Sequence, residues 1–194
     1  MWGRILVFVL LLVQSFGLNT DGIFLLSFKY SVLWDPLGVL DSWNYNDETP
    51  CSWNGVTCGT PAGMSDAVTG LSLPNSQLLG SIPVNLGMLQ HLQDLNLSNN
   101  SINGSLPLSL FNLSELRTLD FSNNLISGEL PELVGGLKSL EFLNLSDNAL
   151  AGNIPGNLNT LHNLTVISLK SNYFSGSLPI GFDFVQVLDL SSNL

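Results

Sequence analysis

The chain has 194 residues, of which 15 are acidic and five basic, so its formal net charge at neutral pH is −10. Such an acidic balance argues against nucleic acid or an anionic membrane surface as a partner. The charge is dispersed along the chain with no acidic tail, and solubility explains it more simply than electrostatic steering of a partner.

The first residues predict an export signal. Arg4 precedes an apolar run from Ile5 to Val13, and the small residues Ser15 and Gly17 mark a cleavage point before Leu18. About nine apolar residues are too few to span a bilayer, which needs about 20. The charged start and small-residue end disfavour the alternatives, an uncleaved anchor or a buried helix. We therefore predict residues 1–17 as a signal peptide and an extracellular (apoplastic) product with no later membrane span in this chain.

Two cysteines, Cys51 and Cys58, have six residues between them in a chain with an export signal. Export favours one disulfide over two free thiols, and closing this loop is worth about 2–3 kcal/mol. A metal site is a poor alternative, because two thiolates without a nearby histidine supply half of a zinc site. No segment has a phosphate-binding spacing either, so we predict no metal and no cofactor.

An internal repeat decides the fold. Similar segments, among them LNLSNNSINGSLP and LDFSNNLISGELP, recur at a spacing of 24 residues over about 120 residues, and the last repeat is shortened to 21 and incomplete. The segments begin at Leu71, Leu95, Leu119, Leu143, Ile167 and Leu188. Each contributes a short period-2 strand, and burial of a few leucines cannot offset the backbone entropy of one 24-residue unit. The units must therefore stack as a solenoid with one parallel sheet.

Within each unit the strand places two side chains inward. The predicted inward positions are Leu71, Leu73, Leu95, Leu97, Leu119, Phe121, Leu143, Leu145, Ile167 and Leu169. An asparagine then recurs at one phase, at Asn100, Asn124, Asn148, Asn172 and Asn193, with Ser76 in the first unit. Turn formation is the simpler role for asparagine, but recurrence at one phase favours a ladder that satisfies buried backbone groups of adjacent turns. A glycine and, three residues later, a proline bend the chain back from Gly80, Gly104, Gly128, Gly152 and Gly176.

The repeat L-x-x-L-x-x-L-x-L-S-x-N-x-L-x-G-x-I-P resembles the plant-type leucine-rich repeat of receptor-like kinases and receptor-like proteins. The segment before it is similar to the N-terminal cap of that family. The matching features are a helix from Asp21 to about Val32, the pair Asp35 and Pro36, Trp43, and C-S-W-N-G-V-T-C from Cys51. In this cap Leu25, Phe28, Trp43 and Trp53 are expected to cover the open core of the first repeat.

The resemblance implies an α/β solenoid, a right-handed superhelix with a parallel inner sheet, a narrow second sheet and a disulfide-bonded helical cap. The expected domains are the signal peptide (1–17), the cap (18–67) and the repeats (68–194), five full and a sixth incomplete. The family implies a peptide or protein ligand, a co-receptor ectodomain as a further partner, and a plasma-membrane protein with a kinase domain. The chain ends at Leu194 without that domain, which indicates a short-ectodomain kinase truncated before its membrane and kinase regions.

Ligands of such solenoids meet the inner sheet. The candidate positions on it are Gln93, Asp94, Asn96, Arg117, Thr118, Asp120, Glu141, Phe142, Asn144, Thr165, Val166, Ser168 and Lys170. Phe142 is the one large apolar side chain among them and is the candidate anchor, although single exposed aromatics often have no role. Some receptors of this family hold a ligand carboxylate with paired arginines. Arg117 and Lys170 lie two units apart, so that mode of recognition is not expected here.

Six sequons predict N-glycosylation, and some are expected to be coincidental because Asn and Ser recur for structural reasons. They lie at Asn96, Asn99, Asn103, Asn112, Asn144 and Asn163. Asn96 and Asn144 fall in strands of the inner face, where a glycan would block docking. Asn112 and Asn163 fall just before strands and are better placed for modification.

Catalysis is not expected, because H-E-x-x-H, G-x-S-x-G and phosphate-loop motifs are absent from the sequence. His91 and His162 occupy turn positions without an evident carboxylate or nucleophile partner. The main alternative to a receptor ectodomain is a secreted inhibitor similar to the polygalacturonase-inhibiting proteins, which normally close with a cysteine cap. A non-functional truncated product is the third possibility.

Overall fold

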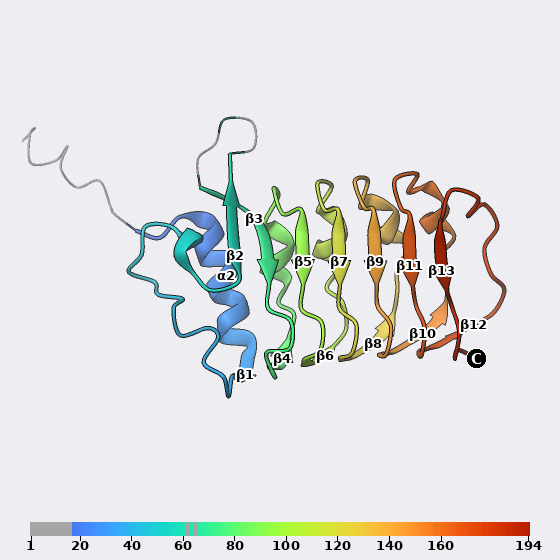
Figure 1. The fold of residues 1–194 in the computed structure, drawn as a ribbon, viewed down its shortest axis with the longest axis horizontal. Helices are drawn as coiled ribbons and strands as arrows, with labels where there is room; N and C mark the ends of the chain where they lie inside the picture. Colours follow the sequence, from blue (N-terminus) through green and yellow to red (C-terminus); the bar gives the residue numbers. More distant parts are fainter. Residues whose placement is uncertain (1–16, 61–62, 64–65) are drawn as a thin grey trace, which may run out of the picture.

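The computed structural model describes residues 17–60, 63 and 66–194. The predicted signal peptide therefore lies outside the described residues, except for Gly17. The described chain is an elongated solenoid, with the cap helix at one end and the strands of successive repeats side by side along the long axis (Figure 1). The predicted fold class, a leucine-rich-repeat solenoid with a disulfide-bonded helical cap, is confirmed.

Seven strands form the inner sheet, which is parallel except where β2 meets β3 antiparallel. Neighbouring repeats pair in constant register, for example Leu95 with Leu119 and Leu119 with Leu143. Because the register is constant, residues of one phase form straight rows across the sheet. In spatial order the strands are β13 (Val187–Asp189), β11 (Val166–Ser168), β9 (Phe142–Asn144), β7 (Thr118–Asp120), β5 (Asp94–Asn96), β3 (Ala67–Ser72) and β2 (Val56–Gly59).

A second sheet runs along the other side of the repeats, and short 3-10 helices connect it back to the inner sheet. Its strands are β1 (Val32–Trp34), β4 (Leu79–Ser81), β6 (Ser101–Gly104), β8 (Leu125–Glu129), β10 (Ala149–Asn153) and β12 (Tyr173–Ser175). The connecting 3-10 helices are η3 (Val84–Met88), η4 (Leu108–Asn112), η5 (Glu132–Gly136) and η6 (Gly156–Thr160). Each begins directly after the proline of its repeat, whose fixed φ suits the first turn of a helix and whose missing N–H costs nothing there.

The core is a single apolar stack that runs through all repeats. All ten side chains predicted to point inward are at most 2% exposed. In the last strand Leu188 is 39% exposed, whereas Ile167, its partner one repeat earlier, is 1% exposed. Each buried leucine contributes about 1.5–3 kcal/mol, which is why the array depends on contact between neighbouring units.

The recurring asparagines lie between the turns of neighbouring repeats. The Asn124 amide nitrogen donates to the carbonyl oxygens of Leu97 (3.0 Å) and Phe121 (3.1 Å), and its oxygen accepts from the N–H of Ile102 (2.9 Å). The same arrangement recurs at Asn100, Asn148, Asn172 and Asn193. The residue before each of these asparagines has φ between 53° and 59°, a left-handed conformation that Asn, Asp and Ser tolerate in turns.

The cap closes the first repeat with aromatic side chains and buried polar bonds. It begins with α2 (Thr20–Ser31), which the Asn19 side chain caps by accepting from the Gly22 N–H. Trp43 and Trp53 stack with ring centroids 5.3 Å apart, and both are 2% exposed, as expected for core cover. The Lys29 ammonium donates to the carbonyl oxygens of Leu40 and Trp43, at 2.7 and 2.9 Å.

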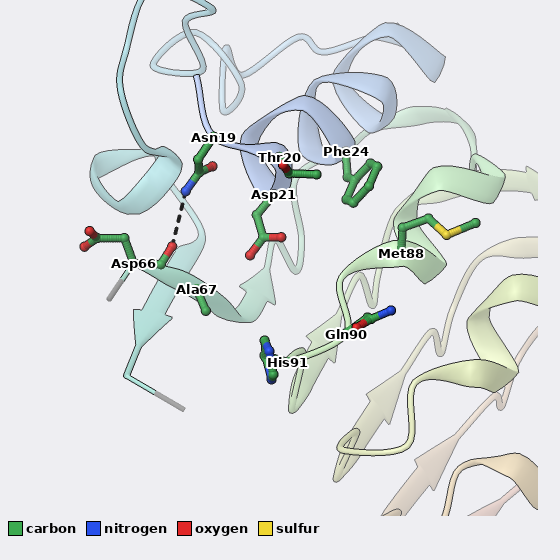
Figure 2. A pocket seen from close by; sticks show the side chains of 9 residues that line it. All are labelled: Asn19, Thr20, Asp21, Phe24, Asp66, Ala67, Met88, Gln90 and His91. Atoms are coloured by element: carbon green, nitrogen blue, oxygen red, sulfur yellow. Dashed lines mark hydrogen bonds between the residues drawn. The ribbon is translucent and has the colours of Figure 1, made fainter. Parts of the chain in front are cut away.

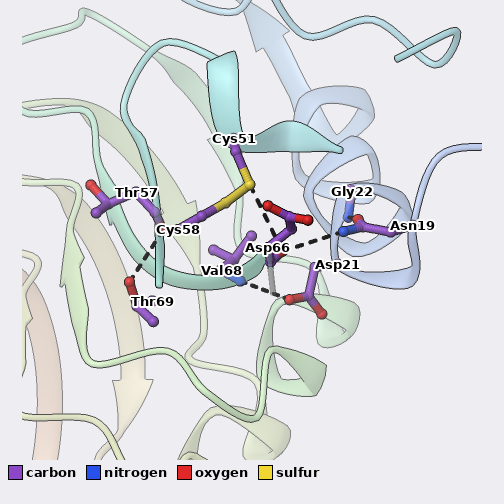
Figure 3. The surroundings of a disulfide bond; sticks show 9 residues. All are labelled: Asn19, Asp21, Gly22, Cys51, Thr57, Cys58, Asp66, Val68 and Thr69. Atoms are coloured by element: carbon purple, nitrogen blue, oxygen red, sulfur yellow. Dashed lines mark hydrogen bonds between the residues drawn. A yellow bond between two sulfur atoms is a disulfide. The ribbon is translucent and has the colours of Figure 1, made fainter. Parts of the chain in front are cut away.

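The disulfide joins Cys51 in the short 3-10 helix η1 (Pro50–Ser52) to Cys58 in β2, with the two Cα atoms 5.4 Å apart. Figure 3 shows it beside the start of β3, where the Val68 N–H donates to the Asp21 carboxylate at 2.9 Å. The disulfide ties β2 to η1, and the Val68–Asp21 hydrogen bond ties the start of β3 to α2. The cap and the first repeat strand are therefore one packed unit.

The cap helix agrees with its predicted bounds to within one residue at each end. It ends at Ser31, because Val32 is extended and pairs with Gly80 at the start of β1. This close approach needs glycine at residue 80, since a Cβ there would lie 2.5 Å from the Ser31 carbonyl oxygen. The last strand begins only at Val187, because Val185 belongs to a turn closed on Phe182.

Candidate functional site

The outward side chains of the inner sheet form parallel rows, and the first residue of each strand makes one of them. This first row consists of Asp94, Thr118, Phe142, Val166 and Val187, paired in register from β5 to β13. Parallel strands lie about 4.8 Å apart, so the last three residues form a continuous apolar row about 10 Å long. Val187 is 52% exposed, and Phe142 and Val166 are half-buried. Phe142, the candidate anchor, therefore has two smaller apolar neighbours in the same row.

Val187 was missed because it lies in the shortened repeat, where the 24-residue spacing does not reach it. Its phase relative to Leu188 was the available signal, since every first-row residue immediately precedes an inward leucine or isoleucine. The complete row is found when each position is taken as the residue immediately before an inward leucine or isoleucine, rather than as 24 residues after its counterpart in the preceding repeat.

Charged residues flank the apolar row. Arg117 lies next to Glu141 on the adjacent repeat, with Nη1 3.6 Å from Oε1, and both side chains are more than half exposed. Such an exposed pair contributes only about 0–1 kcal/mol, so both groups can be redirected to a partner at little cost. Lys170 is exposed near the far end of the row. The structure thus brings Arg117, Glu141 and Phe142 together, as neighbours on one face.

The last residue of β5, β7, β9 and β13 has a structural role. The Asn96 side-chain oxygen accepts from the N–H and hydroxyl of Ser98, at 3.0 and 2.8 Å. Asp120, Asn144 and Asp189 accept the same two bonds from the serine two residues later. Ser168 holds this position in β11 and is half-buried. Three candidate ligand positions, Asn96, Asp120 and Asn144, are therefore already engaged in closing their own turns.

The equivalent bonds in β13 also lower the pKa of a carboxyl group, that of Asp189. The two hydrogen bonds from Ser191, first from its hydroxyl and then from its N–H, hold the pKa of Asp189 below the ordinary 3.8, and the positive charge of Lys170 adds to the effect. Charge-assisted hydrogen bonds stabilise the ionised carboxylate, which is the reason for the direction of the shift. Asp189 therefore keeps a negative charge at the end of the apolar row at any physiological pH.

A groove of about 480 Å³ lies elsewhere, between the start of α2 and the turn after η3 (Figure 2). Phe24, Ala67 and Met88 supply its apolar lining. Several of its polar groups are already bonded within the protein: Asp21 accepts from the Val68 N–H, and Asn19 caps α2. We therefore regard it as a crevice of the cap–repeat junction rather than as a binding site.

His91, at the edge of this groove, was predicted to lack a carboxylate partner, and that prediction is wrong. Its Nδ1 lies 3.2 Å from a carboxylate oxygen of Glu115 on the next repeat. The contact spans 24 residues, one full unit, so it joins equivalent turns of neighbouring repeats. Among the described residues, no group of three or more His, Cys, Asp or Glu side chains could hold a metal ion.

Family comparisons match both parts of the chain. Residues 18–59 match the leucine rich repeat N-terminal domain, and residues 90–150 and 163–184 match leucine rich repeat families. A "Probable LRR receptor-like serine/threonine-protein kinase" of Arabidopsis thaliana is 57% identical over 81 residues, which is 42% of this chain and 10% of that protein. The match thus spans about a tenth of the length of this curated relative. In the part of the chain that the structure describes, no helix is both long and apolar enough to cross a membrane.

Solved structures match over more of the chain. The BIR2 ectodomain of Arabidopsis thaliana superposes with a TM-score of 0.81 at 35% identity, covering 90% of this chain and 93% of BIR2. The Arabidopsis receptor kinase HAESA, in complex with the peptide hormone IDA and the co-receptor SERK1, gives a TM-score of 0.78 at 35% identity, covering 90% of this chain and 30% of that one. With its cap, its repeat and this near-complete match to a receptor ectodomain, the chain belongs to the leucine-rich-repeat ectodomains of plant receptor kinases.

Proposed function

We propose that this chain is an extracellular recognition module of a plant receptor-like kinase, and that it binds a peptide or protein segment on the inner sheet. The observation that carries the proposal is the row Phe142–Val166–Val187, a continuous apolar strip in register across three strands. Buried aromatic anchors ringed by polar groups dominate the energetics of protein recognition. Arg117, Glu141 and Lys170 supply the polar surround.

The proposal is binding without catalysis. The side chains that approach one another on the inner sheet are Arg117, Glu141 and the apolar row, and this set lacks the pairing of a nucleophile with a base that covalent catalysis uses. The related HAESA structure contains a peptide hormone and a co-receptor, which supports a peptide ligand and a second ectodomain as partners of this chain. The predicted export signal supports an extracellular location.

A second candidate is an ectodomain whose partner is another receptor rather than a peptide. The BIR3–SERK2 complex of Arabidopsis thaliana, which matches 89% of this chain at 34% identity, supports it. Both candidates use a binding surface, so they differ in the partner and not in the chemistry. A secreted inhibitor of the polygalacturonase-inhibiting type is not favoured by these relatives.

Selection of peptides on the exported protein tests the proposal. A displayed library of random 12-residue peptides would be selected on the wild-type chain, and the affinity of each selected peptide would be measured on two variants. We expect Phe142→Ala to weaken binding at least tenfold, or about 1.4 kcal/mol. Leu108→Ala is the matched control, because Leu108 is equally apolar and 60% exposed but lies on η4. Equal affinity for both variants would place the binding surface elsewhere.

A further inference from the structure

The six sequons fall into two structural classes. Asn96 and Asn144 end inner-sheet strands, and each side-chain oxygen accepts two bonds from the serine of its own sequon. That serine is buried in both cases: Ser98 is 6% and Ser146 8% exposed. The remaining four, Asn99, Asn103, Asn112 and Asn163, are exposed.

The inner-sheet sequons have a structural explanation. Asp120 and Asp189 occupy the same position in other repeats, and their carboxylates accept the same bonds from Ser122 and Ser191. An aspartate has no amide nitrogen, so the position requires an acceptor and not a glycosylation site. Asn followed two residues later by Ser therefore arises here from the turn, and the sequon is a by-product of the repeat.

A glycan at these positions would conflict with the fold. Asn96 pairs in register with Ser72 on one side and Asp120 on the other, and the strands lie about 4.8 Å apart. A sugar on the Asn96 amide nitrogen would extend over the side chains of those neighbours. Glycosylation leaves the side-chain oxygen free to accept the turn bonds, so the cost of a glycan is crowding over the neighbouring strands, which disfavours folding and export of chains modified there.

The exposed class has no such conflict. Asn112 lies at the end of η4, and Asn163 in the turn that leads into β11. The Asn163 amide nitrogen donates a single exposed bond to the Lys138 carbonyl oxygen, at 3.2 Å. A glycosylated amide nitrogen keeps one hydrogen, so this bond can survive modification. Both sites lie outside the strands of the inner sheet.

We propose that the exported protein carries N-glycans on the exposed class, with one each on Asn112 and Asn163, and none on Asn96 and Asn144. In the transfer, the amide nitrogen of the asparagine bonds to the anomeric carbon of an oligosaccharide donated from a lipid diphosphate. The bond from that carbon to the diphosphate breaks, the amide loses one proton, and the lipid diphosphate leaves. The proposal depends on export of the chain and not on whether the inner sheet binds a ligand.

Glycopeptide mass spectrometry on the full chain secreted from plant cells tests this directly. Enzymatic deglycosylation in heavy-oxygen water would mark each occupied asparagine as a labelled aspartate, which separates Asn96 from Asn99 by fragmentation. We expect labelled Asn112 and Asn163, and unlabelled Asn96 and Asn144. Label at Asn96 or Asn144 in secreted, folded protein would overturn the proposal, as would unlabelled Asn112 and Asn163.

Two variants sharpen the test. Asp120→Asn creates the sequon Asn-Phe-Ser at the structural position, and we expect the secreted protein to remain unlabelled at residue 120. Leu125→Ser creates the sequon Asn123-Asn124-Ser at the position of Asn99 one repeat later, where Asn123 is exposed, and we expect label at residue 123. A label at residue 120 would contradict the proposal. If either variant is not secreted, the occupancy of the wild-type sites still decides the question.

Discussion

Replacement of one ladder asparagine tests how the repeats are joined. In Asn124→Ala the carbonyl oxygens lose little, because Leu97 still accepts from Asn100 and Phe121 still accepts from Asn148. The Ile102 N–H, in contrast, loses the side-chain oxygen that accepts its bond, and Ile102 is 1% exposed. A buried unsatisfied donor costs about 1–3 kcal/mol, so we expect a loss of stability of that size.

The measurement is urea unfolding of the disulfide-intact protein at neutral pH. The midpoint should fall at constant slope, and the melting temperature should fall by about 2–4 °C for each kcal/mol lost. Asn153→Ala is the matched control, since Asn153 is exposed at the end of β10 and its replacement should change stability by less than about 0.5 kcal/mol. If Asn124→Ala unfolds at the same midpoint as this control, the asparagines do not stabilise the array.

Two further outcomes follow from local geometry. Gly87→Ala should destabilise by about 1–3 kcal/mol in urea unfolding, because a Cβ there would lie 2.5 Å from the Ser109 carbonyl oxygen, whereas Gly156→Ala, with its nearest atom 4.0 Å away, should be close to neutral. Asp189 has a lowered pKa, so its bonds contribute stability that is present above pH 3.8 and lost as the pH falls through the folded-state pKa. Carboxyl titration by NMR should therefore show the pKa of Asp189 moving up towards 3.8 in Ser191→Ala, which removes the hydroxyl donor and keeps the backbone N–H. An unchanged value would exclude the hydroxyl bond as the main cause of the shift.

The repeat architecture was predictable because each coil carries the whole pattern. An inward leucine such as Leu95 is buried by the coils on either side, and both have the same residue types at the same phase. Repetition multiplies a weak local signal into a strong one. The first repeat departs from this pattern. Ser76 stands there in place of the recurring asparagine, because the cap rather than another repeat lies on the outer side of this repeat.

Contacts made only once were not predictable from the sequence. The pairing of β1 with Gly80 and the two bonds from Lys29 join segments with no repeated counterpart. The turn-closing role of Asn96 could be inferred, since Asn or Asp followed two residues later by Ser recurs at four strands. In the repeats with asparagine, however, the same residues also form a sequon. Only the geometry separates an acceptor that closes a turn from a site of modification.

The first and last rows of the inner sheet differ in what constrains their side chains, and this difference indicates which row determines binding specificity. In β5, β7, β9 and β13 the serine two residues after the strand holds the last-row position to a hydrogen-bond acceptor, so the chemistry of that row is restricted in these four strands. The side chains of the first row are free of this constraint, and their residue type changes from Asp94 through Thr118 to Phe142 within three repeats. Variation there leaves the backbone ladder and the core intact. Recognition by this ectodomain is therefore expected to depend on the first row and its flanking charges, while the last row stabilises the coils beneath them.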